Sequence, residues 1–173
     1  MCIKAIIPAR KGSKGLPGKN IKILNNKPLI DYSIETALSI LDPDSIIVTS
    51  DSAEILERGK FFGVKTLLRP EELAQDQSLI IDTIFHAVNQ VEHDLKNEIK
   101  QVILLQPTFP IRNVLEIKNA LNFFRNKKLG SLVSVSKMRE HPCECITISN
   151  KVSKEWKFLV DPSNQTNRQA YSG

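Results

Sequence analysis

Short apolar runs and longer amphipathic stretches alternate along the chain. The apolar runs are typical of strands buried on both faces of a sheet, and they lie at residues 3–7, 46–48, 65–68, 101–105 and 131–135. Between them, apolar residues recur at helical spacing in stretches that begin after Pro28, Ser52, Leu79 and Asn113. This alternation predicts an α/β fold of three layers, doubly wound around a mainly parallel sheet.

Two turns carry signals for the start of a helix. Asp51 and Glu54 follow the strand at 46–48 with the spacing of a capping pair, and we interpret both as caps of the next helix. Asn113 and Glu116 have the same spacing before the last amphipathic stretch, which favours a structural role for the preceding Arg112.

Composition places the chain among ordinary globular proteins. With 173 residues, 41% hydrophobic and 25% charged, it is long enough for one core, so we expect a single domain over 1–173. No apolar run approaches the length needed to cross a membrane, and no signal-peptide pattern opens the sequence, which predicts a cytoplasmic protein. Cys143-x-Cys145 lacks a second pair of ligands, so reduced thiols are expected rather than zinc.

Positive charge is concentrated at the start of the chain. Residues 1–30 contain seven Lys or Arg and no Asp or Glu, in a protein of net charge +5. The loop after the first strand combines three glycines with four cations: Gly12, Gly15, Gly18, Arg10, Lys11, Lys14 and Lys19. Glycines allow positive φ and let backbone N–H groups approach a ligand, and the cations offset negative charge. The pattern predicts a polyphosphate site, with a solvated basic turn as the alternative.

Two standard phosphate loops do not fit this stretch. In a Walker A loop Gly12 and Gly18 would be one residue closer, and a hydroxyl would stand where this chain has Asn20. The dinucleotide fingerprint fails as well, because the glycines have no tight first pair.

Three stretches together resemble one family. Ile7-Pro8-Ala9-Arg10-x-Gly12-Ser13-Lys14-Gly15-Leu16-Pro17-x-Lys19-Asn20 is similar to the nucleotide loop of the acylneuraminate cytidylyltransferases, the CMP-sialic acid synthetases and their relatives. Arg69-Pro70-x-x-Leu73-Ala74-x-Asp76 and Leu104-Leu105-Gln106-Pro107-Thr108-x-Pro110-x-Arg112 match later stretches in the same order. The resemblance implies a Rossmann-like nucleotide-diphospho-sugar transferase fold. It also implies that CTP and a 2-keto sugar acid are converted to a CMP-sugar and pyrophosphate.

The resemblance also implies roles for individual residues. The nucleotide-binding set is Arg10, Gly12, Ser13, Lys19, Asn20, Arg69 and Ser78. Arg10, Lys19 and Gln106 are the expected catalytic residues. Gln106 and Arg168 are expected on the sugar side, where a bidentate arginine suits a carboxylate. Two structural alternatives stay open: Arg69 can pair with Glu71 or Glu72, and Arg168 lies in a polar tail.

The family's magnesium site and its last segment have no counterpart here. Relatives of this kind use Mg²⁺ held by an Asp-x-Asp pair further along, whereas this chain stops at Gly173, so no metal ligands are expected in it. Phe109 stands where the family usually has Ser, and Glu144 replaces a lysine of some members, which leaves the sugar open. A homodimer is also expected.

Three other functions remain as alternatives to this one. The first is a non-catalytic nucleotide-binding remnant, and the second is a related sugar nucleotidyltransferase that uses another base. The third is a nucleic-acid-binding module, which the sequence disfavours because it lacks the aromatic platforms and the extended basic stripe of such surfaces.

Overall fold

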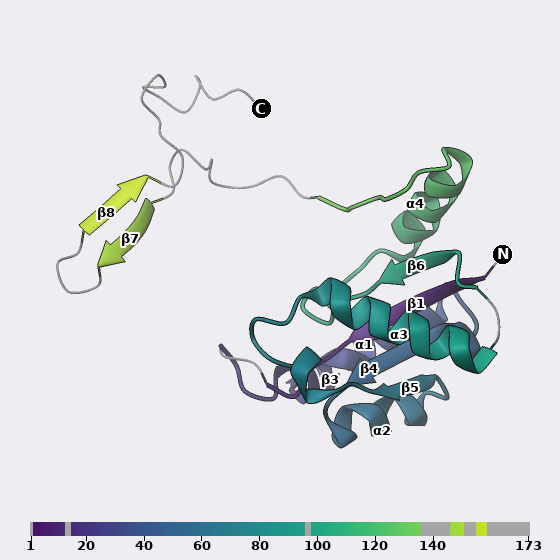
Figure 1. Ribbon diagram of the computed structural model, residues 1–173, viewed down its shortest axis with the longest axis horizontal. Helices are drawn as coiled ribbons and strands as arrows, with labels where there is room; N and C mark the ends of the chain where they lie inside the picture. The colour runs from purple at the N-terminus through teal and green to yellow at the C-terminus, as the bar shows by residue number, and fades with distance from the viewer. Residues whose placement is uncertain (1, 13–14, 96–97, 136–145, 151–154, 159–173) are drawn as a thin grey trace. The chain divides into compact units, whose positions relative to one another are not determined.

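The computed structural model describes residues 2–12, 15–95, 98–135, 146–150 and 155–158. The chain divides into two compact units, Met1–Lys128 and Leu129–Gly173 (Figure 1), and each is considered by itself. The expected single domain over 1–173 stays a prediction.

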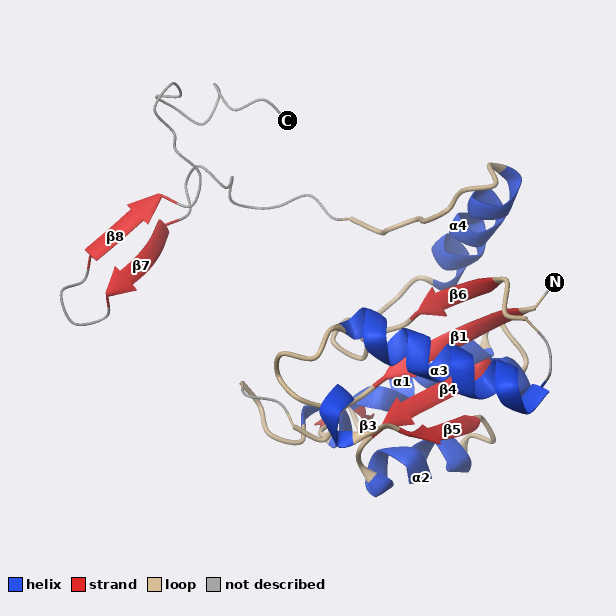
Figure 2. Cartoon of the chain, viewed as in Figure 1, coloured by secondary structure: helices blue, strands red, loops and turns tan. Residues whose placement is uncertain are grey.

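A four-stranded parallel sheet forms the centre of the first unit. Its strands are β1 (Ile3–Pro8), β4 (Ile46–Ser50), β5 (Lys65–Leu68) and β6 (Gln101–Leu104). The order is β5-β4-β1-β6, and every neighbouring pair is parallel (Figure 2). Four of the five predicted strands are therefore confirmed, and so is the parallel sheet.

Helices cover both faces of this sheet. α1 (Leu29–Leu38) and α2 (Ala53–Phe61) pack on one face, and α3 (Ile80–Leu95) crosses the other (Figure 1). Side chains alternate along β1 as the pleat requires: Ala5 and Ile7 join the core under α1 and α2, whereas Ile6 joins the core under α3. The three layers expected from the sequence are thus present.

The remaining elements are short or peripheral. α4 (Val114–Asn126) begins at Asn113, whose side chain accepts from the N–H groups of Leu115 and Glu116, so the predicted cap is confirmed. The second unit contains an antiparallel hairpin of β7 (Ile146–Asn150) and β8 (Glu155–Phe158). Single 3-10 turns span Lys19–Ile21, Pro43–Ser45 and Glu71–Leu73.

A small hairpin before α1 was not expected. β2 (Ile23–Leu24) and β3 (Lys27–Pro28) pair in antiparallel fashion. Asn25 and Asn26 connect them with φ of 47° and 70°. Asparagine tolerates this left-handed region better than most residues, so the Asn-Asn pair was the signal for the turn.

Two expectations from the sequence are wrong. The strand at 131–135 does not form: these residues are irregular, pair with no strand in the described part of the chain, and leave Val133 76% and Val135 92% exposed. An apolar run becomes a strand only where a neighbour supplies hydrogen bonds.

The predicted capping role of Asp51 is the second error. Ser52 is the N-cap of α2 and its side chain makes no capping bond. The Asp51 carboxylate instead accepts a hydrogen bond from the Lys11 N–H at 2.7 Å. The neighbouring strand delivers this donor, and sequence spacing alone does not reveal it.

Among the described residues, no helix is both long and apolar enough to cross a membrane.

Close packing of α2 on the sheet gives a stability prediction. A Cβ atom at Gly59 would lie 2.6 Å from Thr66 Cγ2 and 3.3 Å from Val48 Cβ. We expect Gly59→Ala to lower the free energy of unfolding by about 1–3 kcal/mol, because this overpacking outweighs the better helix propensity of alanine. Urea denaturation measures the change, and Gly130→Ala, which has open space around it, is the control. Equal or greater stability of Gly59→Ala would contradict the packing described.

Candidate functional site

A cavity of about 530 Å³ lies at the carboxyl edge of the parallel sheet. The exits of β1, β5 and β6 all contribute to it, together with the loop after β1 and the start of α3. Its polar lining includes Arg10, Lys19, Asn20, Arg69, Gln75, Asp76, Ser78, Thr83, Gln106 and Thr108. The carboxyl ends of strands in an open α/β sheet are where such folds bind ligands.

The loop after β1 turns at Gly18 and is stabilised by a hydrogen bond from Asn20. Gly18 has φ of 65° and precedes the 3-10 turn that begins at Lys19. The buried Asn20 amide donates to the Arg10 carbonyl at 2.9 Å, which closes the loop. Gly18 thus uses the positive φ that glycine allows, whereas Gly12 does not. Nothing lies within 4 Å of where a Cβ atom of Gly12 or Gly15 would be.

Arg10 is held toward the cavity by the segment after β5. Its Nη1 lies 2.7 Å from Asp76 Oδ1 and donates to the Ala74 carbonyl at 3.5 Å. The Arg10 side chain is 32% exposed and that of Asp76 is 39% exposed, so the pair is accessible to solvent. An ion pair of this kind is weak, and a ligand with higher negative charge can replace the carboxylate at Arg10.

Arg69 is the most buried cation of the cavity. It is 5% exposed, and its Nη1 donates to Thr83 Oγ1 at 3.4 Å. Its Nε and Nη2 are buried without a hydrogen-bond partner. Burial lowers the pKa of the Arg69 guanidinium from its ordinary value, whereas the charge of Asp51 raises it and that of Arg10 lowers it.

The partner of Arg69 differs from both alternatives weighed on the sequence. Within the described residues its ion-pair partner is Asp51, with 3.8 Å between Nη2 and Oδ1, rather than Glu71 or Glu72. Buried donors without partners are costly, and here they belong to a residue that lines a cavity. A ligand acceptor would satisfy them.

The exit of β6 forms another wall of the cavity. Gln106 lies there, and its carbonyl accepts from Arg112 Nη2. Arg112 also donates to Ser33 Oγ of α1 at 3.0 Å, and burial lowers its pKa. These contacts confirm the structural role expected for Arg112, which fixes the backbone from which the Gln106 side chain projects.

The hydroxyl of Ser78 takes part in a local turn. It donates to the Glu72 carbonyl at 2.6 Å and accepts from the Gln75 N–H at 3.1 Å. Ser78 lines the cavity, but this hydroxyl also organises the segment between β5 and α3.

The structure brings together most of the predicted site. Arg10, Lys19, Asn20, Arg69, Ser78 and Gln106 all line the cavity. Gly12 is not among the lining residues. Ser13 and Arg168 lie outside the described residues, as do Cys143, Glu144 and Cys145. Sequence reasoning missed Asp76 and Thr83 as site residues, although Asp76 belongs to a quoted motif.

The described residues contain no cluster of metal-ligating side chains. Within these ranges no group of three or more His, Cys, Asp or Glu side chains could hold a metal ion. The carboxylates nearest the cavity, Asp51 and Asp76, are each paired with an arginine. We therefore derive no chemical step through a metal held by this part of the chain.

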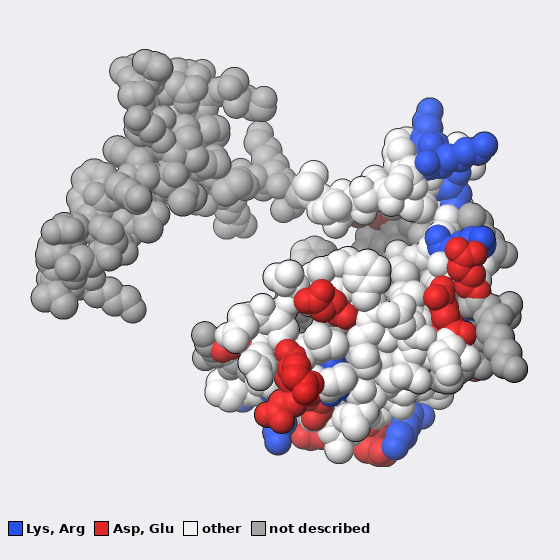
Figure 3. Space-filling model, in the orientation of Figure 1, with Lys and Arg blue, Asp and Glu red and all other residues white. Residues whose placement is uncertain are grey.

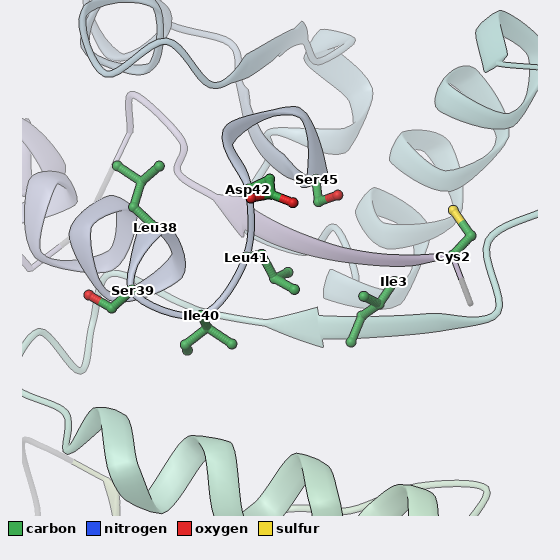
Figure 4. Close-up of a pocket in the computed structure, with 8 residues that line it drawn as sticks. All are labelled: Cys2, Ile3, Leu38, Ser39, Ile40, Leu41, Asp42 and Ser45. Carbon is green, nitrogen blue, oxygen red and sulfur yellow. The ribbon is translucent and has the colours of Figure 1, made fainter.

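A second cavity, of about 430 Å³, lies at the opposite end of β1 (Figure 4). Its lining is Cys2, Ile3, Leu38, Ser39, Ile40, Leu41, Asp42 and Ser45. Its lining contains no Lys or Arg, so it lacks the cationic donors with which the first cavity can bind a phosphate.

The surface charge is uneven on the face that Figure 3 shows. Lys and Arg gather near the end of α4, whereas the surface over α3 is mainly uncharged. This face lacks the continuous basic stripe that nucleic-acid binding uses.

Comparison with known proteins identifies the family. The family model described as cytidylyltransferase matches residues 4–158. The chain is 40% identical over 136 residues to the N-acylneuraminate cytidylyltransferase of Escherichia coli O18:K1:H7, covering 78% of this chain and 31% of that protein. It is 38% identical over 153 residues to the CMP-N,N'-diacetyllegionaminic acid synthase of Legionella pneumophila, covering 87% of this chain and 65% of that protein.

A solved structure agrees with these relatives. A CMP:2-keto-3-deoxy-manno-octonic acid synthetase in complex with CTP superposes with a TM-score of 0.60 and 26% identity, covering 74% of this chain and 49% of the other. The chain spans between 31% and 65% of the length of these two curated relatives. The match of the family model over most of the sequence shows that the chain belongs to the cytidylyltransferase family.

Proposed function

We propose that this chain is the nucleotide-binding part of a cytidylyltransferase that activates a 2-keto sugar acid of the sialic acid type with CTP. The observation that carries the proposal is the buried Arg69, which lines the cavity with two unsatisfied donors beside the basic loop. The relatives named above make CMP-activated acids of this class, which supports both the nucleotide and the acceptor.

The proposed reaction is a displacement at phosphorus. The anomeric hydroxyl oxygen of the acid attacks the α-phosphorus of CTP, the bond to the bridging oxygen breaks, and pyrophosphate leaves while the hydroxyl proton passes to solvent or a base. Negative charge grows on the phosphate oxygens and the leaving group. Preorganised cations and N–H donors stabilise that charge, and losing one such contact costs on the order of a hundredfold in rate.

Each residue has a proposed role in this scheme. Arg10 and Lys19 would neutralise the phosphates, and Asn20 would hold the loop in place through the Arg10 carbonyl. Arg69 would donate to the nucleoside end with its free Nε and Nη2, with Ser78 beside it. Gln106 can offer both a donor and an acceptor to the sugar. Roles for Gly12, Ser13 and Arg168 rest on the family resemblance alone.

Mg²⁺, a homodimer and a cytoplasmic location complete the proposal. Mg²⁺ would neutralise charge on the nucleotide phosphates when bound, and this part of the proposal rests on the family resemblance. The homodimer rests on the family resemblance. The cytoplasmic location is proposed from the sequence pattern alone.

Binding of CTP is the first test. We expect calorimetry with Mg²⁺ to show uptake of CTP by the chain and an affinity about tenfold weaker for Arg10→Ala, since Arg10 is an accessible cation of the cavity. Lys118→Ala, on the exposed side of α4, is the matched control for a lost cation. No binding of CTP or another nucleoside triphosphate would contradict the proposal.

Turnover separates the proposed enzyme from a binding remnant. The remnant is the second candidate, favoured by the lack of a metal-ligating cluster in the described residues. Pyrophosphate release is measured with CTP and a panel of 2-keto sugar acids. We expect CTP binding to be retained better than turnover; binding with turnover at background for every acid supports the remnant.

Substitution of Arg69 separates binding from stability. Arg69→Met removes a buried charge with two unsatisfied donors but also the ion-pair partner of Asp51, whose side chain is 22% exposed, so we expect only a small change in thermal stability. The same change should weaken CTP binding about tenfold or more. Arg125→Met, at an exposed position of α4, is the control and should leave CTP affinity unchanged. A destabilised variant that binds CTP normally would show that Arg69 serves only the fold.

A further inference from the structure

Asp51, at the exit of β4, contacts two residues that lie far apart in the sequence, Lys11 of the basic loop and Arg69 of the cavity. Its Oδ1 accepts from the Lys11 N–H of the basic loop at 2.7 Å. The same oxygen lies 3.8 Å from Arg69 Nη2. Lys11 and Arg69 come from the exits of two different strands, so one carboxylate oxygen stands between the loop and the buried arginine.

The order of the strands explains why Asp51 can reach both. β4 lies between β1 and β5 in the sheet. The exit of β1 is tied to it by Ala9 N–H donating to the Thr49 carbonyl at 3.0 Å, and the exit of β5 by Arg69 N–H donating to the Ser50 carbonyl at 2.8 Å. Asp51 directly follows Ser50, the last residue of β4. Just beyond the sheet, its side chain contacts the same two neighbouring segments, at Lys11 after β1 and at Arg69 after β5.

The negative charge of Asp51 affects Arg69 because a second cation, Arg10, lies nearby. Arg10 and Arg69 are close enough for the charge of Arg10 to lower the pKa of Arg69, and the charge of Asp51 opposes that effect. Arg10 has its own carboxylate partner in Asp76. At 3.8 Å the Asp51 contact is too long for a hydrogen bond, so it acts on Arg69 through charge, and Nε and Nη2 remain without a hydrogen-bond partner.

We propose that Asp51 is a positioning residue that sets the separation between the phosphate-binding loop and Arg69. It touches neither reacting atom in this scheme; it acts by holding the loop at Lys11 and the guanidinium of Arg69 at once. A nucleotide that spans from the loop to Arg69 then binds to two groups that are already held at the required separation. This inference rests on the proposed nucleotide site and adds a residue to it.

Three variants and two probes test the inference. Asp51→Ala removes both contacts, and Asp51→Asn keeps an acceptor for the Lys11 N–H but removes the charge that orients Arg69. Glu54→Gln removes a carboxylate three positions away, from the exposed first turn of α2, and is the control. The probes are CTP and inorganic tripolyphosphate, each titrated with Mg²⁺ by calorimetry on folded protein. Tripolyphosphate reports on the loop alone, and CTP on the loop and the nucleoside end together.

We expect Asp51→Ala to weaken CTP binding about tenfold or more and Asp51→Asn to fall between it and the unchanged protein. In Asp51→Asn the preference for CTP over tripolyphosphate should drop about threefold, because the loop contact survives while Arg69 is released. Glu54→Gln should match the unchanged protein for both probes. A role in stability alone would lower the melting temperature but leave these affinities intact.

The remaining outcomes contradict either the role of Asp51 or the proposed nucleotide site. If the unchanged protein takes up CTP and both Asp51 variants bind it within about twofold of Glu54→Gln, Asp51 is not a positioning residue and the proposed function stands. Tighter CTP binding by Asp51→Ala would also overturn the inference, because the carboxylate would then be a competitor for Arg69. If the unchanged protein binds no CTP, the proposed function fails and the inference with it. Asp51→Asn, which keeps the size of the side chain, decides the case if Asp51→Ala does not fold.

Discussion

The parallel pairing of β1, β4 and β5 is the constraint on which the site depends. Parallel strands end at one edge of a sheet, so the basic loop, Asp51 and Arg69 meet although about sixty residues separate the first from the last. Backbone hydrogen bonds from the N–H groups of Ala9 and Arg69 tie the exits of β1 and β5 to β4. Burial of β1 and β4 on both faces keeps that edge rigid. The chemistry of the cavity is thus fixed by the hydrophobic core beneath it.

The cavity combines arginines with carboxylate partners that a polyanionic ligand can replace or supplement. Two arginines face it, each with an aspartate beside it, and the more buried arginine retains donors without partners. A site of this kind stores an unfavourable burial energy that a ligand can relieve. Arg69 therefore has donors in place before a ligand arrives, which is the kind of preorganisation that electrostatic catalysis requires, whereas Arg10 exchanges the Asp76 carboxylate for the ligand.

Much of this arrangement could be predicted from the sequence. Apolar runs and helical periodicity gave four strands, their parallel pairing and the helices around them, because burial on both faces leaves a clear pattern. The basic loop, Arg69 and Gln106 came from short motifs that the fold does bring to one cavity. The family was also expected correctly from these motifs.

The remaining features depend on contacts that local sequence does not encode. Asp51 has the spacing of a helix cap, and only the neighbouring strand makes it a partner of Lys11. The run at 131–135 has strand composition, but a strand also needs a neighbour to pair with. Positive φ at Gly18 but not at Gly12 follows from the path of the loop rather than from glycine content.

A crystal structure of the chain with CTP tests the central claim most directly. The account predicts the triphosphate against the loop after β1, and Nε or Nη2 of Arg69 at about 3 Å from an acceptor on the nucleoside. A nucleotide bound elsewhere, or bound here with both Arg69 donors still unsatisfied, would contradict it.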